Sequence, residues 1–169
     1  MVDQADRYRQ LALLGRDAFL DSAAPAALVR RRASDETGDS EKFPRLSDED
    51  TMAAAARKPQ RPPSGIEVYP LVKKPGASFA DMITIGRTPN NDIVLRDVTV
   101  SRLHAFFRKR DARWVIADAG SKNGTKVSGQ VLEPRKETEV ASGTTMRIGE
   151  VEVTFYSAAD LFGVLLTQQ

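Results

Sequence analysis

The stretch between residues 66 and 156 constrains the fold most, because it is a succession of short apolar runs separated by turn residues. Apolar residues alternate with polar ones inside several runs, as at Val151, Val153 and Phe155. The dipeptide Asn123-Gly124 is typical of a tight hairpin turn. The expected strands cover residues 66–72, 82–86, 92–95, 104–110, 113–118, 130–132, 144–148 and 151–156. Many short strands with turns at this spacing predict an all-β fold, a β-sandwich.

The segments on either side differ in composition. Residues 1–32 are predicted to form a helical N-terminal segment, since Tyr8, Leu11 and Leu14 recur at helical spacing. Residues 33–64 are first acidic and then proline-rich, which predicts a mobile linker. The expected domains are the helical segment at 1–32, the linker at 33–64, the β-sandwich at 65–157 and a short C-terminal helix at 158–169.

The composition excludes several classes of function. A formal net charge of +2 is too balanced for a general nucleic-acid binder, and the absence of cysteine excludes disulfides, zinc thiolates and thiol nucleophiles. The first residues lack the basic and apolar stretches of a secretory signal, and no apolar run approaches the roughly 20 residues of a membrane-spanning helix. These features predict a cytoplasmic protein without nucleic-acid or membrane partners.

Three expected strand ends carry groups that can hold an anion. Arg87 follows the strand at 82–86, and its guanidinium offers forked donors that suit a phosphate. Ser101 lies in the loop before another strand, and Asn123 can donate and accept through its amide. Taken singly, Arg87 is explained as a surface arginine, Ser101 as a loop serine and Asn123 as a turn residue. Their common position at strand ends favours an anion-binding pocket.

His104 is the only histidine and invites a catalytic interpretation. A serine hydrolase also needs an orienting carboxylate and an oxyanion hole, and no serine lies in a Gly-x-Ser-x-Gly sequence. His104 follows Ser101 by three residues, so its ring is expected to support the loop that carries Ser101. With no acid/base or metal constellation in view, the sequence predicts a protein without enzymatic activity, cofactor or metal.

This set of motifs resembles that of the forkhead-associated (FHA) domain. The resemblance covers about residues 65–157 and rests on Gly-Arg at 86–87, Ser-x-x-His at 101–104, Asn-Gly at 123–124, Gly143 and Gly149. It implies an eleven-stranded β-sandwich whose loops, at one end, bind phosphothreonine peptides without catalysing a reaction. It therefore implies a signalling protein, of a kind found in bacteria, whose partner is a phosphothreonine-containing protein of a Ser/Thr kinase pathway.

Carried over by position, the resemblance assigns roles to individual residues. Phosphate contacts would come from Arg87 and Ser101 with help from Arg102 and Lys122, and a contact to the peptide main chain would come from Asn123. Support for the binding loops would come from Gly86, His104, Gly124 and Thr125.

Two alternatives remain open. Thr37 and Thr51 lie beside acidic residues, so a phosphorylated N-terminal tail could bind the pocket of its own chain and inhibit it. The helical segment at 1–32 cannot bury its apolar face alone, so it must dock on the sandwich, pair with a copy of itself or bind a partner. The last two cases would make the chain a structural or oligomeric component of a signalling or secretion assembly.

Overall fold

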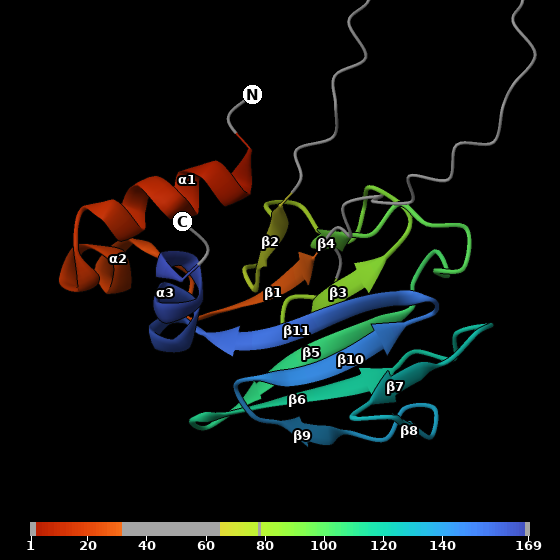
Figure 1. Ribbon diagram of the computed structural model, residues 1–169. Coiled ribbons are helices and arrows are strands. Elements are labelled where there is room, and N and C mark those ends of the chain that lie inside the picture. Colours follow the sequence, from red (N-terminus) through yellow and green to blue (C-terminus); the bar gives the residue numbers. More distant parts are fainter. Residues whose placement is uncertain (1–2, 32–64, 78, 168–169) are drawn as a thin grey trace, which may run out of the picture. The chain divides into compact units, whose positions relative to one another are not determined.

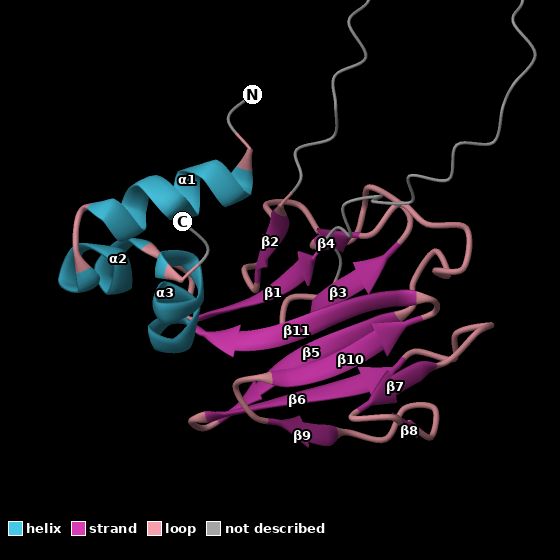
Figure 2. Ribbon diagram, viewed as in Figure 1, coloured by secondary structure: helices cyan, strands magenta, loops and turns pink. Residues whose placement is uncertain are grey.

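The structure, a computed structural model, describes residues 3–31, 65–77 and 79–167. These residues form two β-sheets and three helices (Figure 1, Figure 2). The predicted linker at 33–64 lies outside the described residues, and so do Thr37 and Thr51.

The strands in the described part of the chain pair mostly antiparallel, and only β3 and β4 run parallel. The first sheet contains, from edge to edge, β2 (Ile66–Pro70), β1 (Ala26–Arg31), β11 (Val151–Ser157), β10 (Thr144–Ile148), β7 (Thr125–Val127) and β8 (Gln130–Val131). The second contains β4 (Ile93–Val94), β3 (Ile83–Gly86), β5 (Ala105–Arg110), β6 (Arg113–Asp118) and β9 (Thr138–Val140). These eleven strands confirm the predicted β-sandwich.

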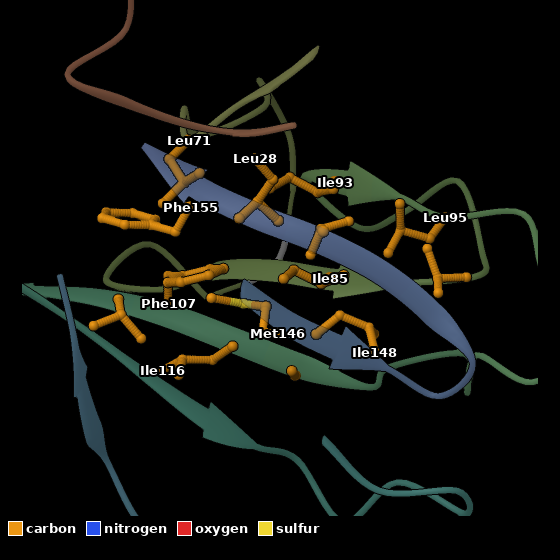
Figure 3. Close-up of a cluster of buried hydrophobic side chains, with 14 of the residues drawn as sticks. Leu28, Leu71, Ile85, Ile93, Leu95, Phe107, Ile116, Met146, Ile148 and Phe155 are labelled. Carbon is orange, nitrogen blue, oxygen red and sulfur yellow. The ribbon is translucent and has the colours of Figure 1, made fainter. Parts of the chain in front are cut away.

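Side chains from both sheets interleave in one hydrophobic core (Figure 3). In β5, Ala105 and Phe107 are fully buried in this core, whereas Phe106 between them lies on the opposite face and is half-buried. Val153 and Phe155 of β11 meet them from the other sheet, and the rings of Phe107 and Phe155 stack with centroids 5.9 Å apart. Burying a side chain of this size contributes about 1.5–3 kcal/mol, so the core fixes the register of the strands that carry the loops.

The prediction of a helical segment over residues 1–32 is wrong for its last part. Residues 26–31 form β1, which pairs with β2 on one side and β11 on the other. Residues 26 to 29 are all buried, so this apolar run shows no alternation, and its pattern alone does not distinguish a strand from a buried helix. Pro25 precedes the strand and cannot continue the helix before it. The sandwich therefore includes a strand outside the expected domain at 65–157.

Three helices cover the outer face of β1 and its neighbours. They are α1 (Gln4–Leu13), α2 (Arg16–Ser22) and α3 (Ala158–Leu166), the last being the predicted C-terminal helix. Phe19 of α2 is fully buried, with ring centroids 5.9 Å from Tyr8 and 5.4 Å from Phe162. Ala27 and Val29 of β1 belong to the same cluster, and Figure 1 shows the three helices gathered beside the sheets. The N-terminal helices therefore dock on the sandwich of their own chain.

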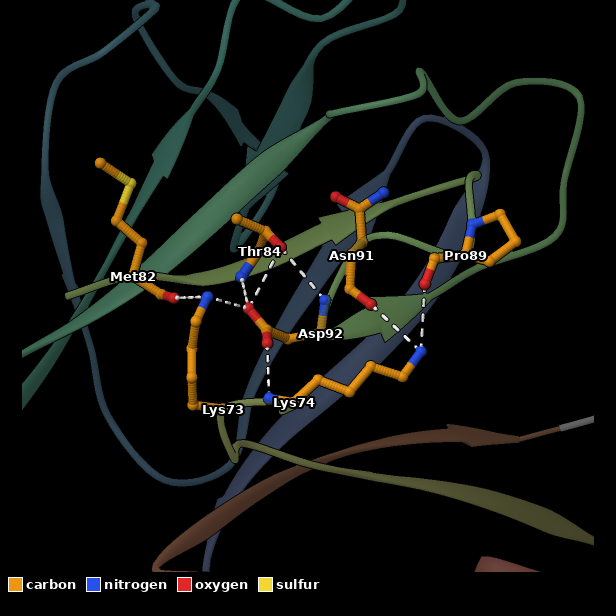
Figure 4. A network of polar contacts seen from close by, with 7 residues as sticks. All are labelled: Lys73, Lys74, Met82, Thr84, Pro89, Asn91 and Asp92. Atoms are coloured by element: carbon orange, nitrogen blue, oxygen red, sulfur yellow. Dashed lines mark hydrogen bonds and ion pairs between the residues drawn. The ribbon is translucent and has the colours of Figure 1, made fainter. Parts of the chain in front are cut away.

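A buried carboxylate joins the loop after β2 to the residues before β4 (Figure 4). The side chain of Asp92 is fully buried and accepts a hydrogen bond from the Lys73 ammonium at 2.8 Å. It also accepts from the backbone N–H groups of Lys74 at 2.7 Å and Thr84 at 2.9 Å. Burial by itself would raise the pKa of Asp92, but these donors outweigh it and hold that pKa below its ordinary value. The ionised carboxylate thus fixes the segment that leads into β3, and Arg87 directly follows β3.

Replacing this carboxylate tests its contribution. Asp92→Asn is expected to lower the free energy of unfolding by about 2 kcal/mol at neutral pH, because a charged acceptor of several hydrogen bonds is lost. The folded pKa of Asp92 is depressed, so its contribution is complete above the unfolded value of about 4 and is lost as pH falls through the folded value. Urea denaturation at pH values between about 7 and 2 measures the difference between wild type and variant, which is expected to shrink in acid.

Asp111→Asn is the matched control, because Asp111 is exposed at a hairpin tip with φ of 55°, a conformation that asparagine tolerates. It is expected to leave stability nearly unchanged. A destabilisation by Asp92→Asn that is the same at every pH would contradict the assigned role of the charge.

Candidate functional site

Three loops meet at one end of the sandwich. The loop after β3 begins with Arg87, the loop before β5 carries Ser101 and Arg102, and the loop before β7 carries Lys122 and Asn123. All five residues line one hollow of about 480 Å³, which we call the loop hollow. The structure therefore brings together every residue that the sequence predicted to contact a phosphopeptide.

The loop hollow is suited to an anion. Its lining is completed by Val98, Thr99, Val100, Leu103 and Gly120. None of the lining residues is acidic, whereas Arg87, Arg102 and Lys122 are all exposed and bring positive charge. Guanidinium and ammonium groups without a competing carboxylate attract a phosphate and hold it with charge-assisted hydrogen bonds.

The imidazole of His104 ties two of these loops together. Its Nδ1 accepts a hydrogen bond from the backbone N–H of Ser101 at 3.0 Å, so the neutral ring carries its proton on Nε2, which donates to the carbonyl oxygen of Gly124 at 2.9 Å. Burial lowers the pKa of His104, and the Gly124 carbonyl and the Asp118 carboxylate oppose this only in part. Because the side chain is fully buried, the imidazole supports the loops and does not reach the loop hollow.

Ser101 is held between the other two loops. The backbone N–H of Arg87 donates to the carbonyl of Ser101 at 3.0 Å, and the backbone N–H of Lys122 donates to the Ser101 hydroxyl oxygen at 3.1 Å. The hydroxyl thus accepts one hydrogen bond and retains its own proton for donation to an anion. These contacts fix Arg87, Ser101 and Lys122 relative to one another.

Asn123 is oriented by Thr99, a residue that no sequence motif indicated. The Nδ2 of Asn123 donates to the carbonyl of Thr99 at 2.8 Å, which leaves the side-chain carbonyl and a second N–H for a peptide main chain. The Thr99 hydroxyl in turn accepts from the backbone N–H of Glu150 at 2.9 Å. The turn between β10 and β11 therefore supports Thr99, and through it the side chain of Asn123.

Gly86 lies against the loop that carries Arg102. A Cβ on Gly86 would come within 2.0 Å of the carbonyl oxygen of Arg102, so a larger residue would displace that loop. The same carbonyl accepts a hydrogen bond from Nδ2 of Asn91 at 2.7 Å, and Asn91 is buried. Asn91 is a second supporting residue that the sequence did not indicate. This close packing explains why glycine immediately precedes Arg87.

Asp118, at the end of β6, shapes the loop that leads to Gly124 and Thr125. Its carboxylate accepts hydrogen bonds from the backbone N–H of Ser121 at 2.9 Å and from the hydroxyl of Thr125 at 2.7 Å. Burial acts to raise the pKa of Asp118, but the hydroxyl and amide donors outweigh it and lower that pKa. Gly124 has φ of 80°, in the left-handed region that glycine adopts without strain.

Two other kinds of feature are not found among the described residues. They contain no group of three or more histidine or acidic side chains placed to hold a metal ion. No helix within them is long and apolar enough to cross a membrane.

Residues 83–149 match the family model of the FHA domain, and this range contains every residue that lines the loop hollow. The chain is 37% identical over 108 residues to the oxoglutarate dehydrogenase inhibitor of Corynebacterium diphtheriae, which covers 61% of this chain and 73% of that protein. It is 36% identical over 104 residues to the glycogen accumulation regulator GarA of Mycobacterium tuberculosis, which covers 54% of this chain and 62% of that protein.

A similar solved structure is that of Mycobacterium tuberculosis EmbR in complex with a low-affinity phosphopeptide. The match has a TM-score of 0.46 and 34% identity over 55% of this chain and 22% of that chain. The chain thus spans less than two thirds of GarA and about a fifth of EmbR.

A β-sandwich whose loops enclose a hollow lined by exposed cationic side chains is suited to binding a phosphorylated peptide. The chain belongs to the FHA domain family. The prediction of a module that recognises phosphothreonine in Ser/Thr kinase signalling is thereby confirmed.

The close approach of Gly86 to the neighbouring loop can be tested by adding one methyl group. Gly86→Ala is expected to cost about 2 kcal/mol of stability or more, because its Cβ collides with a backbone carbonyl rather than with a flexible side chain. Gly163→Ala is the matched control, since its Cβ meets nothing within 4 Å in α3, where alanine is the better helix former. It is expected to be neutral or stabilising in urea denaturation. Equal stabilities of the two variants would contradict the packing described for Gly86.

Proposed function

We propose that the loop hollow binds the phosphothreonine of a partner protein through specific contacts of five residues. Arg87 and the hydroxyl of Ser101 hold the phosphate oxygens. Arg102 and Lys122 add positive charge at the rim, and Asn123 binds the peptide main chain beside the phosphothreonine. The family membership supports this ligand class, and the convergence of these residues on one hollow supports the assignment of roles.

The observation that carries the proposal is the fixed position of the Ser101 hydroxyl. It is held by the backbone N–H of Lys122 at 3.1 Å, while His104 holds the backbone N–H of the same serine at 3.0 Å. A donor that is already oriented loses little freedom when a phosphate arrives, so more of each contact is retained as affinity. Each charge-assisted hydrogen bond contributes about 1.5–3 kcal/mol.

In this proposal the chain regulates its partner by binding and catalyses no reaction itself. One relative is named for inhibition of oxoglutarate dehydrogenase and another for regulation of glycogen accumulation. By analogy, the partner is a phosphorylated enzyme or kinase of a cytoplasmic Ser/Thr kinase pathway. Neither nucleic acid nor membrane takes part in this mode of action. The binding module is the sandwich at 65–157 together with β1.

Arg87→Ala is expected to weaken binding of a phosphothreonine peptide by about 100-fold, or about 2.8 kcal/mol, the equivalent of one to two charge-assisted hydrogen bonds. The peptide is one selected from a random phosphothreonine library by the wild-type chain, and its affinity is measured by isothermal titration calorimetry. Arg113→Ala removes a guanidinium from the start of β6, outside the loop hollow, and is expected to leave the affinity unchanged. Wild-type affinity in Arg87→Ala, with the fold intact by circular dichroism, would refute the assigned contact.

The same peptide with phosphoserine in place of phosphothreonine lacks one methyl group. Its affinity is expected to be about fivefold lower, because burial of a methyl group contributes about 1 kcal/mol. Val98 and Leu103 give the hollow the apolar surface that such a methyl group requires. Equal affinity for the two phosphopeptides would show that the hollow reads phosphate without distinguishing threonine.

A further inference from the structure

A second hollow, of about 400 Å³, lies on the outer face of the sheet formed by β3, β5 and β6. We call it the sheet-face hollow. Its lining includes Phe79, Met82, Leu103, Phe106, Arg108 and Arg135. The neighbours of Phe106 in β5, Ala105 and Phe107, point into the core, so Phe106 points away from it. The core of the sandwich therefore does not account for this group of apolar side chains.

The sheet-face hollow presents apolar surface to solvent. Phe79 is 54% exposed and Leu103 is 40% exposed. Phe79 also has φ of 64°, a left-handed conformation that a bulky residue rarely adopts. A strained, exposed aromatic ring adds little to the stability of the fold. Such rings and exposed apolar patches are typical of surfaces that contact another molecule.

The charges around this hollow favour an acidic ligand. The Arg108 guanidinium lies over the ring of Phe106, 5.1 Å from its centroid. Its charge is balanced by Asp81 at 3.3 Å and Glu137 at 2.9 Å. Arg135 is exposed and makes no ion pair with any residue in the described ranges. A carboxylate arriving beside the apolar side chains would therefore meet a guanidinium that has no other partner there.

The two hollows are adjacent. Leu103 lines both of them, and it directly follows Arg102 at the rim of the loop hollow. An extended peptide advances about 3.3 Å per residue. A peptide whose phosphothreonine occupies the loop hollow therefore reaches the sheet-face hollow within several residues.

We propose that the sheet-face hollow binds a second segment of the same phosphorylated partner, in which a large apolar side chain stands next to a carboxylate. The apolar side chain packs against Phe79 and Leu103, and the carboxylate pairs with Arg135. This inference rests on the proposed function, because the bound phosphothreonine raises the local concentration of the second segment. The phosphate then supplies affinity that every phosphorylated partner shares, and the second segment distinguishes one partner from another.

Two random phosphothreonine peptide libraries test the proposal, a short one with about three residues on each side of the phosphothreonine and a long one with about eight. From the long library, wild-type protein is expected to enrich peptides with an apolar residue next to Asp or Glu. This pair is expected at positions farther from the phosphothreonine than the short library extends. The selected long peptide is expected to bind about fivefold tighter than its truncated form.

Two variants test the residues of the sheet-face hollow. Phe79→Gly removes the ring at a conformation that glycine accepts, and Arg135→Glu reverses the charge. Each is expected to abolish the fivefold gain and to leave the affinity of the short peptide unchanged.

The controls change exposed residues at the end of α1 and the start of α2, outside both hollows. Leu14→Ala removes a side chain that is 72% exposed, and Arg16→Glu reverses an exposed charge at the start of α2. Both are expected to preserve the affinities of the long and short peptides. Retention of the fivefold gain in Phe79→Gly and Arg135→Glu, or no enrichment beyond the short window, would overturn the proposal. Failure of wild-type protein to bind the short peptides would instead refute the proposed function, so the two failures are distinguishable.

Discussion

The binding loops depend on the two hydrogen bonds of one buried imidazole. His104 satisfies the backbone N–H of Ser101 and the carbonyl of Gly124, which come from loops twenty or more residues apart. Both bonds require the neutral ring with its proton on Nε2, and burial favours that form by lowering the pKa of His104. This contribution to stability is complete above the ordinary histidine pKa and is lost as pH falls through the depressed folded value. The only histidine of the chain thus holds the geometry of the site constant across neutral pH.

The fold could be predicted where one face of a strand is buried and the other is not. β5 and β11 alternate in this way, and both were expected close to their observed positions. β1 was missed because it is buried on both faces, between the core and the helices, so its pattern carries no period of two. β9 was missed for the opposite reason, since its three residues lie in a polar stretch at the edge of a sheet.

The residues of the site also fall into a group that the sequence indicated and a group that it did not. The residues proposed to bind the phosphopeptide could be selected from the sequence, because an arginine, a serine and an asparagine at strand ends indicate anion and peptide binding by their type and position. Residues that hold them could not, because their roles come from partners that only folding brings together. Thr99 meets Asn123 from 24 residues away, and Asn91 meets Arg102 from 11 residues away. Asp118 resembles any acidic residue at a strand end until its bonds to the following loop are seen.

The position of β1 between β2 and β11 has a consequence for the order of folding. Leu28 pairs with Phe155, so a strand near one end of the chain waits for a partner near the other. At typical rates of synthesis, β1 leaves the ribosome roughly ten seconds before β11 exists. Pairings between such distant segments also fold slowly, because a long stretch of chain must be closed before any contact forms. During that interval β1 has only β2 to pair with, so its other edge is open, and the nascent chain is most vulnerable to aggregation there.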